Sequence, residues 1–216
     1  PSNETEKWLL LTLKEISLKV GIKTPEFGLF KSQQLNAFAT GFSKNNSLVA
    51  LSSGLVNHMN RDEIEAVIAH EISHISNGDM VTMTLIQGII NTFVIFFSRV
   101  IGHIVDRVVF KVQRGHGPAY YITSIITQII LSILASMIVM WFSRKREYAA
   151  DSSAANLVGP SKMISALKTL SLKSTSELPD QMAAFGISGK DKNTFKSLFS
   201  SHPPIESRIE SLLKNS

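Results

Sequence analysis

The stretch DEIEAVIAHEISHIS, residues 62–76, decides the fold. Asn60, followed three residues later by Glu63, predicts a capping box at the start of a helix, and Asn77-Gly78 predicts its end. Between these two signals the apolar residues recur at helical spacing. We therefore expect a helix that buries one side in the core, the side that carries Ile64, Val67, Ile68, Ile72 and Ile75.

This helix carries the pattern His-Glu-x-x-His at His70, Glu71 and His74. Residues four apart share a helix face, so both imidazoles can bind one Zn²⁺. Zn²⁺ lowers the pKa of a bound water toward about 7. The carboxylate of Glu71 can take a proton from that water and return it to a leaving amine. The pattern therefore predicts a metal-dependent hydrolase, and two surface histidines on an ordinary helix are the alternative.

The third protein ligand that a catalytic zinc requires cannot be a cysteine, because the chain has none. The position six residues after the motif, which supplies a histidine in metzincins, is Met80. His58 lies too close to the start of the same helix to fold back. His103 and His116 lie between two long apolar runs. An acidic residue from a second helix is therefore the better candidate.

Glu147 is that candidate, in the segment SRKREYAADSSAA. Asp151 follows four residues later and shares its helix face. We expect Glu147 to bind the metal. We expect Asp151 to accept an N–H from His70 or His74, which would set the tautomer of that ring. The alternative is a solvated Glu147 paired with a neighbouring basic side chain.

Two long runs carry no charged residue: 80–98, with 19 residues, and 119–142, with 24. A helix that crosses a bilayer needs about 20 mostly apolar residues, so both runs qualify by length. Buried core helices in a larger domain are the alternative. The second run has small or amide residues at four-residue spacing, which predicts close packing against another helix in lipid. These residues are Ser124, Gln128, Ser132 and Ser136.

Two spans would form a hairpin and return the chain to the side it left. Glu147 would then emerge next to the helix that carries His70 and His74, whereas a single span would put the ligands on opposite sides. The positive-inside rule does not decide the orientation, because basic residues flank both ends of the hairpin. They are Arg99, Arg107, Lys111 and Arg114 (with Asp106) on one flank, and Arg144, Lys145 and Arg146 on the other.

The remaining segments predict a small α+β unit around the hairpin. Strands are expected over 26–30, 36–41 and 47–52. The run 47–52 could be an edge strand that pairs with an extended substrate, and an ordinary half-buried strand is the alternative. A looser Ser/Gly/Lys-rich stretch covers 172–192. Helices are expected over 6–20, 147–158, 161–170 and 205–213.

The predicted organisation has three parts. An N-terminal half over 1–79 contains the sheet and the HEISH helix, a two-span hairpin covers 80–143, and a C-terminal half over 144–216 supplies the third ligand. The net charge of +5 fits a protein near an anionic membrane surface. The 22 basic residues form no stripe interleaved with aromatic residues, so we expect no nucleic-acid partner.

Four ordered motifs together resemble those of the HtpX family: NAFATG, HEISH on a helix, EYAAD after an apolar hairpin, and HPPIESR near the C-terminus. These are bacterial membrane-bound heat-shock zinc proteases, related to the CaaX prenyl-protein endopeptidases. The resemblance implies a mainly α fold with a small β element, in which a transmembrane hairpin interrupts a gluzincin-like metallopeptidase domain. It also implies one Zn²⁺ per chain, held by His70, His74 and Glu147. Glu71 would be the general base for the metal-bound water that attacks the peptide carbonyl.

The same resemblance implies a location and a class of substrate. The protein would be multi-pass in the bacterial plasma (inner) membrane, its site would face the cytoplasm, and it would cleave misfolded or damaged membrane proteins. Members of the family usually carry two further hydrophobic helices before the soluble N-terminal part. The sequence begins at Pro1 without them, so we expect a trimmed chain, and its oligomeric state stays open.

His202 and Arg208, in the last of the four motifs, are candidates to stabilise the oxyanion that forms during acyl transfer. The alternative is that HPP caps the last helix and that Arg208 pairs with a surface acid. Two other interpretations of the whole chain remain open. One is a membrane-anchored binding or scaffold protein with a structural zinc, in which His202 would be a fourth ligand. The other is a soluble metalloprotease with buried helices in place of spans.

Overall fold

Helix α3 (Arg61–Asn77) forms the centre of the fold in the computed structural model, which describes residues 3–174 and 202–214. Both predicted end signals are confirmed: Asn60 and Glu63 form a capping box, and Gly78, in the left-handed region at φ 73°, ends the helix. Each fully buried isoleucine contributes roughly 1.5–3 kcal/mol of hydrophobic free energy. The core therefore forms around the α3 residues Ile64, Ile68, Ile72 and Ile75, which are at most 3% exposed.

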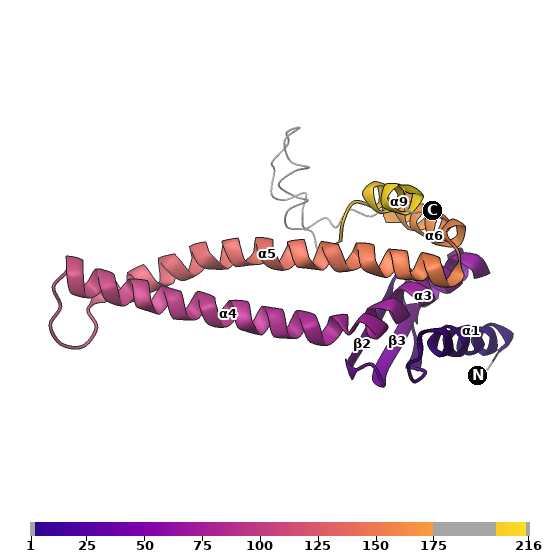
Figure 1. Cartoon of the computed structure of the whole chain (residues 1–216), viewed down its shortest axis with the longest axis horizontal. Helices are drawn as coiled ribbons and strands as arrows, with labels where there is room; N and C mark the ends of the chain where they lie inside the picture. The colour runs from indigo at the N-terminus through magenta and orange to yellow at the C-terminus, as the bar shows by residue number, and fades with distance from the viewer. Residues whose placement is uncertain (1–2, 175–201, 215–216) are drawn as a thin grey trace.

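Three further helices complete this core (Figure 1). Helix α1 (Glu4–Val20) and helix α6 (Pro160–Ser174) contact α3, and helix α9 (Ile205–Lys214) contacts α6 and α5. All three were expected from the sequence, with ends that differ by a few residues. A short helix, α2 (Ser53–His58), was not predicted. Most of the Ser/Gly/Lys-rich stretch at 172–192 lies outside the described residues.

The sheet has three strands in the order β1-β3-β2: β1 (Glu26–Phe30), β2 (Ala37–Ser43) and β3 (Asn46–Ser52). β3 pairs in parallel with β1 and antiparallel with β2. All three predicted strands are present, but β3 is central, so both of its edges are already paired. Of the two alternatives for 47–52, the edge strand open to a substrate is therefore excluded, and the ordinary strand remains.

Two long helices run side by side away from the end of the molecule that holds α3 and the sheet (Figure 1). Helix α4 (Asp79–Ile104) continues into a π-helical turn (Val105–Val109), and α5 (Pro118–Val158) returns. At 1.5 Å per residue, α5 is about 60 Å long. The helix predicted over 147–158 is therefore not a separate element, because it is the end of α5.

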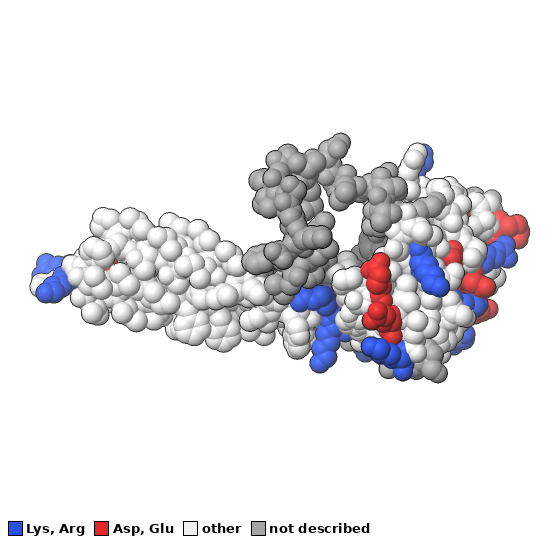
Figure 2. All heavy atoms as spheres, turned by 90° about the horizontal axis from the view of Figure 1, so that it is seen from above, with Lys and Arg blue, Asp and Glu red and all other residues white. Residues whose placement is uncertain are grey.

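The surface of this hairpin is apolar and open to its surroundings. The most apolar 18-residue segments of the two helices have mean hydropathies of 1.8 in α4 and 2.2 in α5. Only 6% and 11% of these segments are buried inside the protein. Figure 2 shows a long stretch of this region without charged side chains, ending in basic residues at the tip. By length and composition, both helices can cross a membrane. The alternative of buried core helices is wrong, because these side chains are exposed.

The contact between α4 and α5 is tight near the hairpin tip. Gly102 of α4 faces Ser124 of α5, and a Cβ at Gly102 would collide with the Ser124 hydroxyl. The predicted stripe of small residues is only partly correct. Ser124 is buried at 3% exposure, but Ser132 is exposed. The contact face instead continues through Ala135 and Val139, which are 9% and 6% exposed.

We expect Gly102→Leu to force the two helices apart, since overpacking a close contact costs about 1–3 kcal/mol. The apparent midpoint of thermal unfolding in detergent should fall. Gly88→Leu is the matched control, because a Cβ at Gly88 meets nothing within 4 Å and both changes give the same gain in helix propensity. Equal midpoints for the two variants would contradict the close contact.

Candidate metal centre

Two imidazoles of α3 point toward each other on one face of the helix. His70 Nε2 lies 3.1 Å from His74 Nε2, and the two rings are nearly perpendicular, at 89°. His70 is only 8% exposed, so its environment is shielded from bulk water. The four-residue spacing thus places two nitrogen ligands at one point, as the motif predicts.

Glu147 brings a carboxylate from α5 to the same point. Its oxygens lie 3.3 Å from His74 Nε2 and 3.7 Å from His70 Nε2, and the residue is 3% exposed. One ligand atom from each of the three residues lies within 4.8 Å of the others. The structure therefore brings together the three residues that were predicted as ligands, although 73 positions separate His74 from Glu147 along the chain.

These separations fit a tetrahedral ion. Zinc bonds to nitrogen and carboxylate oxygen are about 2.0–2.2 Å long, so neighbouring ligand atoms of a tetrahedral site lie about 3.3 Å apart. Here the two nitrogens lie 3.1 Å apart, Glu147 Oε1 lies 3.3 Å from His74 Nε2, and the other oxygen, Oε2, lies 3.7 Å from His70 Nε2. Glu147 Oε2 is also buried, with no hydrogen bond of good geometry among the described residues. The residues present therefore fit a divalent metal.

Each imidazole contacts a second carboxylate through its other nitrogen. Asp151 Oδ1 lies 3.0 Å from His70 Nδ1, although no hydrogen bond of good geometry joins the two atoms. Asp79 Oδ2 lies 2.6 Å from His74 Nδ1. A carboxylate beside Nδ1 favours the tautomer with its proton on that atom, so Nε2 of each ring is left as the metal-binding atom.

Asp79 was not predicted from the sequence. It is the first residue of α4, and Gly78 serves both as the C-cap of α3 and as the N-cap of α4. A turn of one residue makes the new helix start beside the last turn of the old one, and this places Asp79 next to His74. The available signal was an acid directly after a helix-ending glycine, five residues beyond the second histidine.

Arg208 of α9 holds Asp151 in place. Its Nε and Nη2 donate to the two oxygens of Asp151, each at 2.6 Å, in a bidentate pair that is almost fully buried. Burial alone would raise the pKa of Asp151, but Arg208 and His70 outweigh it and hold this pKa below its ordinary value. Burial likewise opposes the charge of Arg208, yet the contact with Asp151 raises the pKa of the guanidinium. Both groups therefore stay charged.

His202 contacts the proposed ligand carboxylate from the other side. Its Nδ1 lies 2.9 Å from Glu147 Oε2, while its side chain is 67% exposed. Arg208 Nη1 lies 3.4 Å from the same oxygen. Burial would raise the pKa of Glu147, but His202 and His74 outweigh it and keep this pKa well below its ordinary range. His202 and Arg208, the two residues suggested as oxyanion donors, thus both lie at the site. Arg208 forms a buried ion pair with Asp151, so the alternative of a pair with a surface acid is wrong.

Two observations describe the electrostatics around Glu71 and His74. Burial would lower the pKa of His74, but Asp79 and Glu147 outweigh it and raise this pKa to about 9. The charge of Glu71 contributes to raising the pKa of both His74 and Arg208. Glu71 is half-buried, so its carboxylate lies near the site and is reachable by solvent. The site as a whole is rich in carboxylates that a divalent cation would neutralise.

A His-Glu-x-x-His helix that meets a buried glutamate of a second helix defines a metallopeptidase of the gluzincin type. Residues 3–216 match peptidase family M48, and the chain belongs to this family. The chain is thus a membrane metalloprotease, which decides against a non-catalytic scaffold.

The relatives agree with this assignment. The chain is 58% identical to Protease HtpX of Thioalkalivibrio sulfidiphilus over 98% of its own length and 72% of the relative. It is 59% identical to Protease HtpX of Pseudoalteromonas atlantica, over 99% and 73%. The crystal structure of S. mikatae Ste24p has a similar fold, with a TM-score of 0.65 at 23% identity. That likeness covers 98% of this chain but spans only 50% of the Ste24p chain.

Replacing Asp79 by Asn should weaken zinc binding by about 10–100-fold, because His74 would lose the charge that orients it. Affinity can be measured by competition with a chelating dye in detergent. Asp62→Asn on α3 is the control, since that carboxylate pairs with Lys162 in a partly exposed ion pair. If the Asp79 variant bound zinc as tightly as the Asp62 variant, Asp79 would have no role in orienting the ligand.

Proposed function

We propose that this chain is a zinc-dependent endopeptidase in which His70, His74 and Glu147 hold one Zn²⁺ and Glu71 is the general base. The convergence of these three ligand atoms from two helices carries the proposal. The His₂Glu donor set leaves a fourth position open, as a catalytic zinc requires. When bound, zinc would polarise both a water molecule and the substrate carbonyl.

Glu71 performs the proton transfers in this proposal. It follows His70 directly on α3, and its charge acts on both His74 and Arg208. Its carboxylate can therefore accept the proton of the attacking water and deliver it to the amine nitrogen that leaves. Asp79 and Asp151 hold the two rings in orientation during these steps.

His202 is the better of the two candidates for the oxyanion donor. Arg208 directs Nε and Nη2 at the two oxygens of Asp151, and this bidentate pair fixes its guanidinium in place. His202 has a largely exposed ring beside Glu147, and a substrate carbonyl arriving from solvent can reach it. Arg208 is then a positioning residue that keeps Asp151 charged and in contact with His70.

We propose that the substrates are polypeptides at the membrane surface, in particular misfolded or damaged membrane proteins. Only Gly78 separates α3, which carries the two histidines, from α4, which enters the apolar hairpin. Met80, where the uncharged run of α4 begins, is only six residues after His74, so the site lies close to the apolar hairpin. In this proposal α4 and α5 are two spans in the bacterial inner membrane and the site faces the cytoplasm. The exposed apolar surface of the two helices supports their insertion.

Glu71→Gln should abolish peptide-bond cleavage while zinc binding is kept. Losing a general base typically costs about 10²–10⁴-fold in rate. Casein hydrolysis and zinc content can be measured on the same detergent-purified sample, with and without chelator. Glu65→Gln on the same helix is the control, because Glu65 pairs with Lys162 away from the site. Full activity of the Glu71 variant would remove Glu71 as the base.

The orientation can be tested with single cysteines, because the chain has no native ones. Gln113→Cys, in the exposed loop at the hairpin tip, should react with a membrane-impermeant maleimide in intact cells. Lys214→Cys, at the end of α9, should react only after the inner membrane is permeabilised. Labelling of both variants in intact cells, or the reverse pattern, would contradict a site that faces the cytoplasm.

A further inference from the structure

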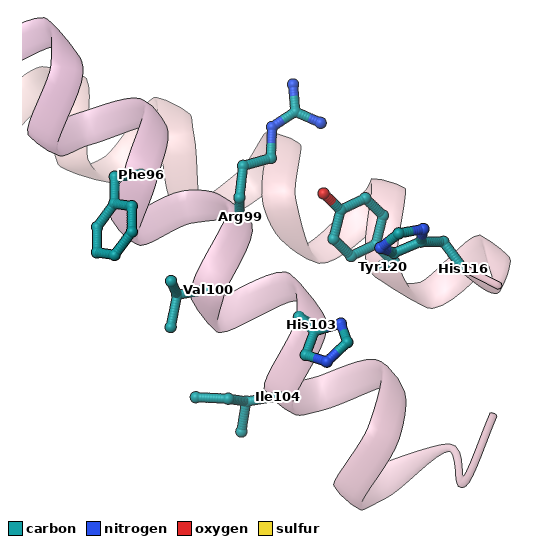
Figure 3. A pocket seen from close by; sticks show the side chains of 7 residues that line it. All are labelled: Phe96, Arg99, Val100, His103, Ile104, His116 and Tyr120. Atoms are coloured by element: carbon teal, nitrogen blue, oxygen red, sulfur yellow. The ribbon is translucent and has the colours of Figure 1, made fainter. Parts of the chain in front are cut away.

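A pocket of about 320 Å³ lies at the tip of the hairpin, at the opposite end of α4 and α5 from the metal centre. The last turns of α4 and the first turn of α5 form its walls (Figure 3). It is lined by Phe96, Arg99, Val100, His103, Ile104, His116 and Tyr120.

Four of the lining residues carry hydrogen-bond donors at the rim, although the surface that lines the pocket is almost entirely apolar. Arg99 and His103 are four residues apart on α4, so they share a helix face. The ring of His103 lies 6.0 Å from that of His116, and His116 lies 4.0 Å from Tyr120. Figure 3 shows Arg99 and His103 on the side of α4 that faces these two residues. No carboxylate in the described part of the chain forms an ion pair with Arg99.

The other side of the pocket is apolar and exposed. Phe96, Val100 and Ile104 are 57%, 36% and 52% exposed. Phe96 lies at the end of the uncharged run of α4, and Val100 and Ile104 lie just beyond it. The run has 19 residues, so it is about 28 Å long and matches the hydrocarbon thickness of a bilayer. The pocket therefore lies at the depth where acyl chains meet headgroups, with its donors on the headgroup side.

The charge of the tip is not balanced within the loop. Residues 99–117 contain one acid, Asp106, and four basic residues: Arg99, Arg107, Lys111 and Arg114. Asp106 is fully buried and accepts the Gly117 N–H at 2.9 Å. Asp106 thus stabilises the turn and does not face the pocket ligand. A metal does not suit the pocket, because in the described ranges only the His70, His74 and Glu147 group offers three converging metal-ligand atoms. An anion is the complementary occupant.

We propose that this pocket binds an anionic phospholipid, with its phosphate between Arg99 and the two histidines and its acyl chain along Phe96, Val100 and Ile104. The guanidinium can donate two parallel hydrogen bonds to the phosphate oxygens. Tyr120 lies at the headgroup depth that amphipathic aromatic residues favour. The proposal rests on insertion of the hairpin into the membrane and is independent of the peptidase mechanism. It also supplies a partner for the excess basic charge at the tip.

Native mass spectrometry of the full chain in detergent tests the proposal. Phosphatidylglycerol and phosphatidylcholine of the same acyl composition are added in equal amounts, and the lipid retained per chain is counted. We expect wild type to retain phosphatidylglycerol preferentially. Arg99→Gln should lower this retention by about tenfold, the usual effect of losing a hydrogen bond to a charged group. Zinc stoichiometry checks that each variant is folded.

Lys111→Gln is the matched control, because it removes one charge from the tip at an exposed position outside the pocket. It should leave the retention nearly unchanged. An equal loss in both variants would show that the lipid follows the net charge of the tip, and the pocket would be refuted. Equal retention of the two lipids by wild type would refute it as well, whatever the variants do.

A final arm distinguishes the lipid from free phosphate. Inorganic phosphate at millimolar concentration should not displace the retained phosphatidylglycerol, because it lacks the acyl chain that contacts the apolar side. Full displacement by phosphate would assign the site to a soluble anion and overturn the lipid proposal.

Discussion

The contact between the two imidazoles of α3 and the carboxylate of Glu147 is the constraint on which the rest of the structure depends. It requires α3 and α5 to cross at one point, with buried charge on both sides. Buried charges are stable only when they are paired. This pairing comes from three different helices, through Asp79 of α4, Asp151 of α5 and Arg208 of α9. The contacts at the site therefore link α3, α4, α5 and α9 to one another.

Helix α5 links the membrane part to the chemistry. It carries the second apolar span and then, without a break, Glu147 and Asp151. Helix α4 does the same from the other end, since Asp79 is its first residue. Arg146 of α5 donates to the backbone oxygen of Asp79 at 3.1 Å, and this ties the two helices where they leave the site. The ends of both hairpin helices are therefore part of the candidate metal centre.

Features set by local pattern could be predicted from the chain. The capping box, the end of α3 at Gly78 and the shared face of His70 and His74 depend on residues at most a few positions apart. Glu147 was reached by a longer argument, namely that two apolar runs must return the chain to its starting side. The features that the sequence left open, misjudged or missed are set by distant contacts: the central place of β3, the exposed Ser132 and the contact of Asp79 with His74.

By itself the sequence determined the His-Glu-x-x-His motif and the two apolar helices, and it named Glu147 as the candidate third ligand, because helical periodicity and the length of a bilayer act on contiguous residues. The tertiary structure decided which groups complete the site. Asp79 reaches His74 through a turn of one residue, and Arg208 reaches Asp151 from 57 positions away. Such pairs form where separate helices happen to meet, and the directions of their side chains there depend on the packing of the whole core.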